Sequence, residues 1–285
     1  IINGGFDVWQ RGTSFSGYNF YTSDRWRCSV GVVPTTFTVD KEVQTDGTVA
    51  ALVVNNSTSI CDYHQRIERG ANITSGKSIT ASFDIWGDAT DLILKIGTGT
   101  STDNVTTQTI SVPTTRTRQS VNVTVPTYTS SIDSMLRLSF SFNNKNCTVR
   151  IANVQLELGS VATEFEHRSY GEELALCQRY YENLMTKETQ SMLSSAWAYS
   201  AGQVQTVVRF AVDKRATPTM GYEVGIAYQG TGETGRTDIT PLFYIRSTKA
   251  VMIYANNGVS LTAGQGANLV NRDNGTGMVF ANAEL

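Results

Sequence analysis

Apolar and polar side chains alternate over most of the stretch Ile79-Thr80-Ala81-Ser82-Phe83-Asp84-Ile85-Trp86. The odd-numbered positions of this stretch are all apolar, and in an extended chain they would share one side. Because successive side chains of a β-strand point to opposite faces, the pattern predicts a strand with one buried face. Trp86 falls on the other face, together with Asp84 and Ser82.

The same alternation continues on both sides of this stretch. Residues 121–125 and 136–142 repeat it, and turn-favouring Gly, Asn and Asp residues separate strand-like runs between residues 35 and 158. In residues 149–158 the apolar positions change phase near Ala152-Asn153, which predicts a β-bulge there. No long helical pattern interrupts this region, so the sequence predicts an antiparallel β-sandwich.

One helix is predicted after this region. Ser169 and Glu172 have the spacing of a capping box, which marks a helix start. Apolar side chains then recur at helical spacing up to about Lys187, at Leu174, Cys177, Tyr181 and Leu184. We expect residues 169–189 to form a helix that connects two domains. Its four apolar side chains are the candidates for packing against other copies of the chain.

Strand-like alternation returns after residue 190. The stretches are 204–212, 222–228, 242–246, 250–254 and 277–281. Gly- and Asn-rich segments at 229–238, 255–258 and 264–277 are typical of loops. The predicted organisation is therefore a β domain over residues 1–168, the connector helix over 169–189, and a second, smaller β-sandwich domain over 190–285.

The charge balance excludes several functional classes. The chain has 23 Lys and Arg against 25 Asp and Glu, so it lacks the basic excess that nucleic-acid binding requires. No apolar run approaches the roughly 18 to 20 residues of a membrane-spanning helix. We therefore expect neither nucleic acid nor membrane insertion. The four cysteines form no CxxC pair, which favours buried thiols over a metal site.

The sequence offers no recognisable catalytic centre. His64 and His167 are the only histidines, and the chain contains neither H-E-x-x-H nor G-x-S-x-G. No motif places two carboxylates across a sugar bond. We therefore expect a protein that is not an enzyme and that needs no cofactor for chemistry.

Aromatic side chains are the strongest candidates for ligand contact. The apolar face of a sugar ring stacks on an aromatic ring, while the sugar hydroxyls bond amide, carboxylate and guanidinium groups. Trp86 and Asp84 share the predicted solvent face of their strand, which makes them the first glycan-binding candidates; the others are Tyr63, Trp197 and Tyr199. The alternative is that a second layer or a neighbouring subunit covers Trp86.

Several longer motifs resemble a family of bacteriophage tail-fibre and related virion proteins. The opening segments are Asn3-Gly4-Gly5-Phe6-Asp7-Val8-Trp9-Gln10-Arg11-Gly12 and Tyr21-Thr22-Ser23-Asp24-Arg25-Trp26. Further matches follow in order at 65–68, 154–159, 162–166, 173–174, 177–181, 215–218 and 283–285. The resemblance spans nearly the whole chain. It implies a homotrimeric virion protein with an N-terminal jelly roll, a connector helix and a C-terminal β domain.

The first domain also resembles jelly-roll carbohydrate-binding modules. In those modules an acidic residue near the start and an Asp near the end help to hold a structural calcium ion through oxygen ligands. The resemblance gives Asp7 the first role, whereas Ala152-Asn153 stand where the closing Asp is usual. The departure leaves a structural calcium at Asp7 as an open alternative.

Two functional hypotheses follow. The first is a receptor-binding tail-fibre component that contacts host cell-surface polysaccharide without cleaving it. The second is a purely architectural virion component, such as a head decoration, collar or fibre-shaft protein, that binds other virion proteins. Both place the chain on the phage particle, in a tail or capsid appendage. The first predicts that Trp86, Tyr63 or the rings near Trp197 and Tyr199 are exposed, and the second that subunits bury them.

Overall fold

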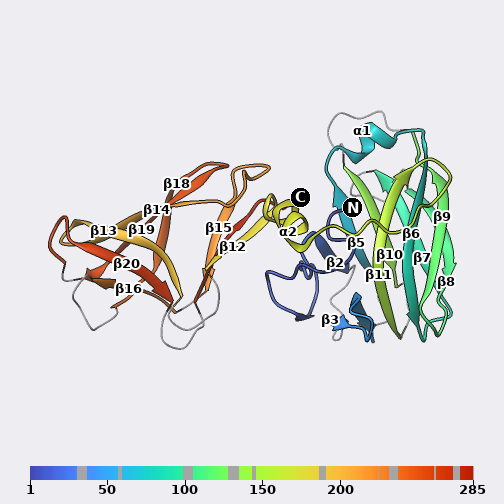
Figure 1. The fold of residues 1–285 in the computed structure, drawn as a ribbon, viewed down its shortest axis with the longest axis horizontal. Helices are drawn as coiled ribbons and strands as arrows, with labels where there is room; N and C mark the ends of the chain where they lie inside the picture. The colour runs from blue at the N-terminus through green and yellow to red at the C-terminus, as the bar shows by residue number, and fades with distance from the viewer. Residues whose placement is uncertain are drawn as a thin grey trace. The chain divides into compact units, whose positions relative to one another are not determined.

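A computed structural model of the chain describes residues 1–30, 37–56, 60–98, 105–127, 135–142, 146–185, 191–223, 225–230, 237–259, 261–271 and 277–284. They form two compact units, Ile1–Leu174 and Ala175–Glu284, drawn in Figure 1. Nearly all regular structure is antiparallel β-strand, which confirms the predicted all-β class with successive β-sandwiches. Within the described residues the only helices are α1 (Gly70–Thr74) and α2 (Tyr170–Gln178). Neither has the length and apolar character needed to cross a membrane.

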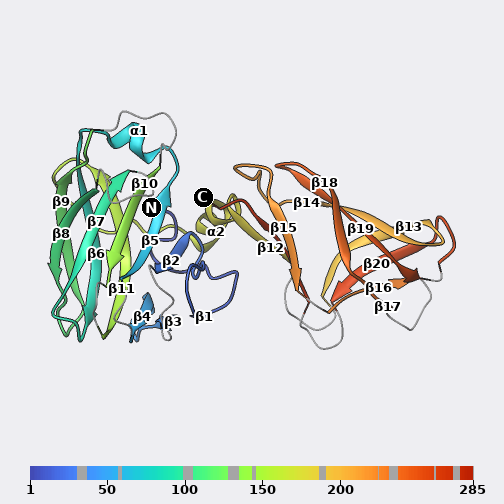
Figure 2. The ribbon, with the colours of Figure 1, turned by 180° about the vertical axis from the view of Figure 1, so that it is seen from behind.

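Two antiparallel sheets form the first unit, which Figure 2 shows from behind. The six-stranded sheet has the spatial order β1 (Ser14–Ser16), β3 (Phe37–Val43), β4 (Val49–Asn55), β11 (Cys147–Leu158), β6 (Ser78–Gly87) and β9 (Thr117–Thr124). The five-stranded sheet has the order β2 (Trp26–Val30), β5 (Cys61–Ile67), β10 (Leu136–Ser141), β7 (Asp91–Thr98) and β8 (Val105–Ser111). From β4 to β11 the chain passes repeatedly from one sheet to the other, as in a jelly roll.

The core of the first unit lies between these sheets. The residues of β6 that alternation predicts to face inward are all fully buried there, namely Ile79, Ala81, Phe83 and Ile85. Phe83 meets Phe140 of the opposite sheet edge to face, with ring centroids 5.0 Å apart. Trp26 stacks on Tyr63 at 5.2 Å in the same core. Burial of large aromatic rings supplies much of the stabilisation of such a sandwich.

The predicted bulge near Ala152-Asn153 is confirmed. The pairing of β11 with β6 shifts register between Ala152 and Gln155, and Asn153 has a left-handed φ of 50°. The N–H of Val154, released from the ladder, donates to the carbonyl of Gly4 at 2.8 Å. A β-carbon on Gly4 would lie only 2.0 Å from the Val154 oxygen, so glycine permits this approach.

The fully buried side chain of Asn3 fastens the N-terminal segment to the sandwich. Its amide nitrogen donates to the carbonyls of Val8 at 2.9 Å and Asp24 at 3.0 Å, and its amide oxygen accepts from the Val8 N–H at 3.0 Å. Its backbone accepts from the Trp26 indole at 2.9 Å and donates to Glu173 at 2.5 Å. We call these five residues the Asn3 clasp. The two motifs that open the phage-family resemblance meet in it.

Two further antiparallel sheets form the second unit. The smaller has the order β12 (Tyr181–Met185), β21 (Met278–Asn282) and β15 (Thr219–Glu223). The larger has the order β17 (Thr237–Asp238), β16 (Ile226–Gly230), β20 (Gly266–Asn271), β13 (Met192–Ser200), β14 (Gly202–Arg209), β19 (Ala250–Val259) and β18 (Pro241–Arg246). Side chains of both sheets share one core, including Ile253 and Leu269 from the larger and Val279 from the smaller.

The helix after the first sandwich is shorter than predicted. Its capping box is present, since Ser169 Oγ donates to Glu172 at 2.8 Å and accepts from the Glu172 N–H at 3.3 Å. However, α2 ends at Gln178, and Tyr181–Met185 form β12 instead. Aromatic side chains favour strands, and here Tyr181 packs on Phe280 of the neighbouring β21 with ring centroids 5.6 Å apart. Residues 186–189 of the predicted helix lie outside the described residues.

Two predicted loops are strands. Residues 255–258 continue β19, and most of the segment 264–277 that is described belongs to β20. β20 lies between β16 and β13, where it buries Ala267 and Leu269. Pairing on both sides therefore outweighs the turn preference of the surrounding Gly and Asn residues.

All four cysteines lie in the described residues and are buried without a disulfide, as the sequence predicts. Burial raises the pKa of Cys61 to about 11 and also raises the pKa of Cys28 well above its ordinary value. Both side chains are therefore protonated thiols at neutral pH.

Gly4→Ala should destabilise the first unit. The added methyl group would overlap the backbone of Val154, and forced overpacking costs about 1–3 kcal/mol. The free energy of unfolding in urea, followed by tryptophan fluorescence, measures the loss. Gly171→Ala is the matched control, because its β-carbon would meet nothing within 4 Å and alanine favours a helix. Equal stability of the two variants would contradict the close approach of Gly4.

Lys214→Met should destabilise the second unit strongly. The Lys214 side chain is 0% exposed and pairs with Glu182, which also accepts from the Ala211 N–H at 3.0 Å. Removing one partner of a buried ion pair leaves an uncompensated charge and costs about 3–5 kcal/mol. Lys249→Met provides the comparison, since Lys249 is 72% exposed and 3.8 Å from Asp213. The same urea titration should leave that variant within about 0.5 kcal/mol of the parent.

Candidate functional site

Trp86 is not the exposed platform that its strand parity predicts. It is only 8% exposed and packs with Ala50 and Ala152 of neighbouring strands. The guanidinium carbon of Arg116 lies 5.9 Å from the centre of its ring. The sequence predicted correctly which face of the strand Trp86 occupies. However, the long side chain of Arg116 lies over the ring and leaves little of the ring surface accessible to a sugar.

Asp84 is the centre of an ionic network on the same outward face. It is 6% exposed and accepts from Arg116 Nε at 2.8 Å, from Arg118 Nη1 at 3.4 Å and from Asn153 Nδ2 at 3.0 Å. Arg116 also pairs with Asp46 at 2.7 Å. Charge-assisted hydrogen bonds of this kind stabilise a partly buried carboxylate. Asp84 thus links three strands of the sheet.

An open pocket of about 370 Å³ lies beside this network. Its lining includes Ser82, Asp84, Arg118 and Asn153 from the sheet, and Phe165 from the segment that follows β11. Arg118 donates to Ser82 at 2.7 Å and lies 6.0 Å from the Phe165 ring. These polar groups already bond one another, so a ligand here would have to compete with them.

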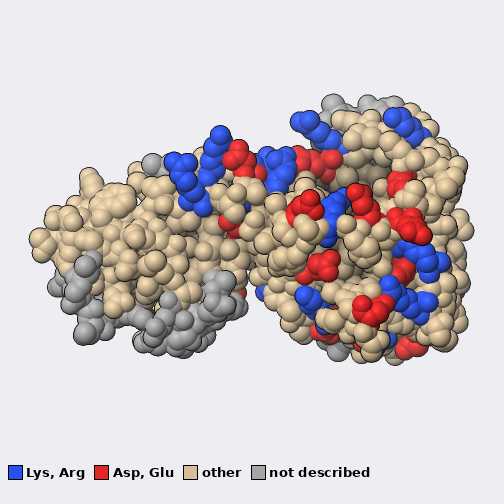
Figure 3. Space-filling model, in the orientation of Figure 1, with Lys and Arg blue, Asp and Glu red and all other residues tan. Residues whose placement is uncertain are grey.

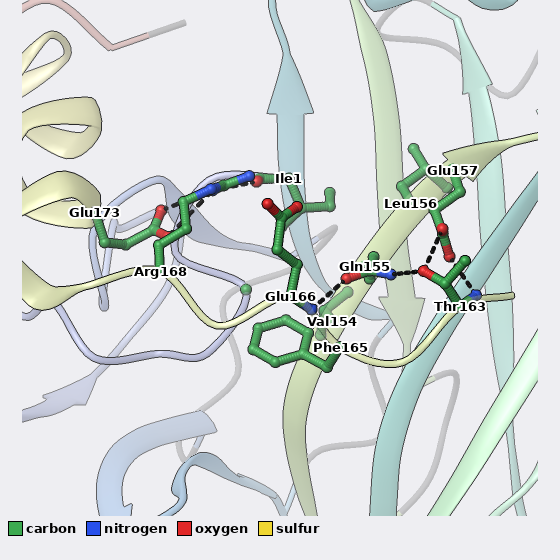
Figure 4. Close-up of a pocket in the computed structure, with 11 residues that line it drawn as sticks. Ile1, Val154, Gln155, Leu156, Glu157, Thr163, Phe165, Glu166, Arg168 and Glu173 are labelled. Carbon is green, nitrogen blue, oxygen red and sulfur yellow. Dashed lines mark hydrogen bonds and ion pairs between the residues drawn. The ribbon is translucent and has the colours of Figure 1, made fainter.

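The segment of residues 159–168, which we call the strap, is fixed to the edge of β11. Figure 4 shows Gln155 and Thr163, which both line a pocket of about 160 Å³, pointing toward each other. Gln155 donates to Thr163 at 3.0 Å and accepts from the Glu166 N–H at 2.8 Å, while Glu157 accepts from the Thr163 hydroxyl at 2.7 Å. The motifs 154–159 and 162–166 therefore hold the strap in place.

Tyr63 is fully buried in the core, so it is not an exposed ring either. Its hydroxyl lies 3.0 Å from Thr22 Oγ1 and 3.1 Å from Ser23 Oγ, and burial raises its pKa. The signal was available in the sequence, because Cys61, Tyr63 and Ile67 alternate with charged or polar residues. That alternation gives Tyr63 the inward parity.

The surroundings of Asp7 do not fit the calcium site that the resemblance implies. Lys41 Nζ lies 3.4 Å from the Asp7 carbonyl oxygen, so a cation of the chain itself already faces this residue. Burial raises the pKa of the half-buried Asp7 carboxyl. Asn153, at the closing position, bonds Asp84 instead. In the part of the chain that the structure describes, no three His, Cys, Asp or Glu side chains group to hold a metal ion.

The four candidates for subunit packing do not form one helical face. Leu174 and Cys177 lie in α2, whereas Tyr181 and Leu184 lie in β12. Cys177 is 0% and Tyr181 2% exposed, so the chain itself covers both, and Leu184 packs against the core of the second unit. The expectation of a continuous apolar helix surface is corrected because α2 ends before Tyr181.

Trp197 and Tyr199 are exposed, at 42% and 64%, on the outward side of β13. The register places Trp197 opposite Gln205, Gln205 opposite Tyr254, and Tyr254 opposite Leu242. This row crosses the four strands β13, β14, β19 and β18. Exposed large side chains of the same strands are Val207, Leu242 and Tyr244. We call the whole set the aromatic face: Trp197, Tyr199, Gln205, Val207, Leu242, Tyr244 and Tyr254.

The aromatic face has the chemistry of a sugar-binding surface. Its rings can stack on pyranose faces, and the Gln205 amide and the tyrosine hydroxyls can bond sugar hydroxyls. On the side drawn in Figure 3, charged side chains are dense over the first unit and sparse over much of the second. The sequence predicted the strands at 204–212, 242–246 and 250–254, but it does not reveal which residues of distant strands stand opposite each other.

Comparisons with known proteins give only distant structural similarity. No family model matches the chain, and no curated protein matches it. Tailspike protein 4 of bacteriophage CBA120, in its enzymatically active domain, matches with 15% identity and a TM-score of 0.38 over 47% of this chain and 19% of that one. A family 11 carbohydrate-binding module from Clostridium thermocellum, solved with a mixed-linked tetrasaccharide, matches with 13% identity and a TM-score of 0.35 over 53% of this chain and 98% of that one.

A cyclase from Fischerella sp. TAU matches with 14% identity and a TM-score of 0.42, over 56% of this chain and 96% of that one. The chain is thus distantly similar to carbohydrate-binding-module sandwiches and to a phage tailspike domain. Because the neighbours include both binding modules and enzymes, likenesses of this size say nothing about ligand or activity.

Asp84→Asn should weaken the first unit without changing ligand binding at the aromatic face. The substitution keeps the size of the side chain but removes the charge that Arg116 and Arg118 share. Hydrogen bonds to a charged group contribute about 1.5–3 kcal/mol, so a loss of about 2 kcal/mol in unfolding free energy is expected. Asp46→Asn, at a carboxylate that is 58% exposed, should cost less than about 1 kcal/mol.

Proposed function

We propose that the chain is a non-enzymatic structural protein of a bacteriophage virion. In this proposal it is a tail-fibre or receptor-binding component that contacts polysaccharide on the host cell surface. Two independent lines of support come from the ordered motifs of the sequence resemblance and from the exposed rings of the second unit. The chain would act on the surface of the phage particle, as a homotrimer.

The aromatic face is the single observation that carries this proposal. Trp197 and Tyr199 are the two predicted glycan contacts that remain exposed, and the register adds Gln205 and Tyr254 beside Trp197. A β-surface with several rings suits a polymer of repeating sugars, because adjacent rings can stack on successive residues. In a trimer three such faces would act together, and linked weak sites gain about 10²–10⁴ in avidity.

The architectural alternative has a specific observation of its own. Val207 is 50% and Leu242 51% exposed within the aromatic face, and aliphatic side chains contribute little to sugar stacking. Exposed apolar groups of this kind are typical of surfaces that another protein covers. Under this alternative the aromatic face binds a second virion protein rather than a glycan.

Trp197→Ala should weaken binding to extracted bacterial surface polysaccharide. A stacked ring contributes about 1 kcal/mol beyond its buried area, so at least a fivefold increase in Kd is expected. Biolayer interferometry on polysaccharides from a panel of strains measures it, and light scattering gives the mass of the assembly. Tyr18→Ala is the matched control, because Tyr18 is 53% exposed in the first unit.

The same measurements separate the two hypotheses. Saturable binding that Trp197→Ala weakens and Tyr18→Ala preserves would support the receptor role. A folded assembly that binds no polysaccharide of any permissive strain would overturn it and favour the architectural role.

A further inference from the structure

The five-stranded sheet of the first unit carries a row of polar side chains on the face away from the core. The register places Arg27 opposite His64, His64 opposite Ser139, and Ser139 opposite Lys95. These four residues therefore cross β2, β5, β10 and β7, and together with Ser141 of β10 we call them the His64 row. Ser141 lies two residues along β10 from Ser139, on the same face and opposite Asp62.

The centre of this row is buried although it faces outward. His64 is 1% exposed, Ser139 0% and Ser141 1%. Four of its polar atoms have no hydrogen-bond partner within the described part of the chain: Arg27 Nε, His64 Nε2, Ser139 Oγ and Ser141 Oγ. Buried polar atoms of native proteins almost always have partners, so a cluster of unpartnered ones on adjacent strands calls for partners from outside the chain, either water or a ligand.

Cations surround this cluster. Arg27, Arg137 and Lys95 lie on the same face as His64, and Arg66 stands directly opposite Arg137. The Asp62 carboxylate lies 3.0 Å from Lys95 Nζ and 3.9 Å from Arg137 Nη2. Arg27 belongs to no ion pair among the described residues. The local excess of positive charge favours an anionic group.

The unpartnered polar groups of this row can donate hydrogen bonds. The Arg27 Nε–H and the two serine hydroxyls can all donate, and Ser29 Oγ lies 3.3 Å from His64 Nδ1. The Nε2 atom of the neutral His64 ring donates in one tautomer and accepts in the other. Burial and the neighbouring arginines lower the pKa of His64 to about 3, so the ring is neutral at physiological pH. The Arg27 Nε–H and the two serine hydroxyls supply three donors, which suit a ligand that is rich in acceptors.

We propose that the His64 row binds an acidic saccharide, with the carboxylate of a uronic acid facing Arg27 and the ring hydroxyls facing Ser139 and Ser141. Adjacent strands are about 4.8 Å apart, so the distance from Arg27 to Ser139 is about 10 Å. A single carboxylate is too small to reach both Arg27 and the two serine hydroxyls, whereas a carboxylate together with neighbouring sugar oxygens can do so. The side chains of Lys95 and Arg137 on this face are 21% and 15% exposed, and in the proposal they move aside to admit the ligand to the buried row.

Calorimetric titration with trigalacturonate tests the proposal. Saturable binding is expected, with Kd raised at least tenfold by Arg27→Gln and at least threefold by Ser139→Ala. Ser139→Ala keeps the test valid if Arg27→Gln disturbs the fold. Arg150→Gln and Ser120→Ala are the matched controls on the opposite sheet and should leave Kd unchanged. The Nε2 signal of His64 in ¹⁵N NMR should shift on titration in the parent protein.

Two further titrations identify the ligand class. Maltotriose, which is neutral, and inorganic phosphate, which lacks a sugar ring, should both bind at least tenfold more weakly than trigalacturonate. Equal binding of either compound, or trigalacturonate binding that neither row variant weakens, would overturn the proposal. The absence of any binding would also overturn it and assign the unpartnered atoms to buried water. None of these outcomes bears on the aromatic face, which Trp197→Ala tests separately.

Discussion

The first sandwich depends on one buried amide. Asn3 uses its side chain and its backbone to bond segments near residues 8, 24, 26 and 173, which are far apart in sequence. Because Gly4 has no side chain, the N-terminal segment can lie against the bulge of β11. There the Gly4 carbonyl accepts the Val154 N–H, which would otherwise lack a partner. A buried amide is costly unless every valence is satisfied. The clasp satisfies them and so fixes where the N-terminal segment runs across the sandwich.

The motifs that resemble the phage family are mostly structural in this chain. Those at the start meet in the Asn3 clasp, and those at 154–159 and 162–166 hold the strap. In the second unit Arg215 donates to the Ala283 carbonyl at 2.7 Å, and its N–H donates to Arg179 at 3.0 Å, so three further motifs also meet. The residues to which we assign ligand contact, such as Trp197 and His64, lie between the motifs instead.

Sequence patterns correctly predicted which face of a strand each side chain occupies, but they did not predict which neighbouring side chains cover that face. The inward residues of β6, the bulge at Ala152-Asn153 and the capping box at Ser169 follow from local periodicity, and all three are present. Whether an outward residue is exposed depends on long side chains from neighbouring strands, as Arg116 over Trp86 illustrates. The end of α2 was mispredicted for a related reason, because β21, nearly a hundred residues later, pairs with Tyr181–Met185. Local propensity does not contain that partner.

The two outward faces of the first sandwich differ in how their polar groups are satisfied. On the six-stranded sheet Asp84, Arg116 and Arg118 bond each other, so charge and hydrogen bonds are balanced within the chain. On the five-stranded sheet His64 Nε2 and the hydroxyls of Ser139 and Ser141 are buried without partners among the residues that the structure describes. The first arrangement stabilises the fold, while the second carries the desolvation cost of unpaired polar groups, which is the basis of the site that we propose there.

Because the four cysteine side chains are buried, the surface of the protein reacts slowly with thiol-specific reagents. Thiolate is the reactive form, and Cys28 and Cys61 are both enclosed and held protonated by their raised pKa values. Cys147 and Cys177 are equally enclosed. One cysteine introduced at an exposed position would therefore react far ahead of the resident four. A single fluorophore can thus be attached at a chosen point on either unit without first removing the natural cysteines.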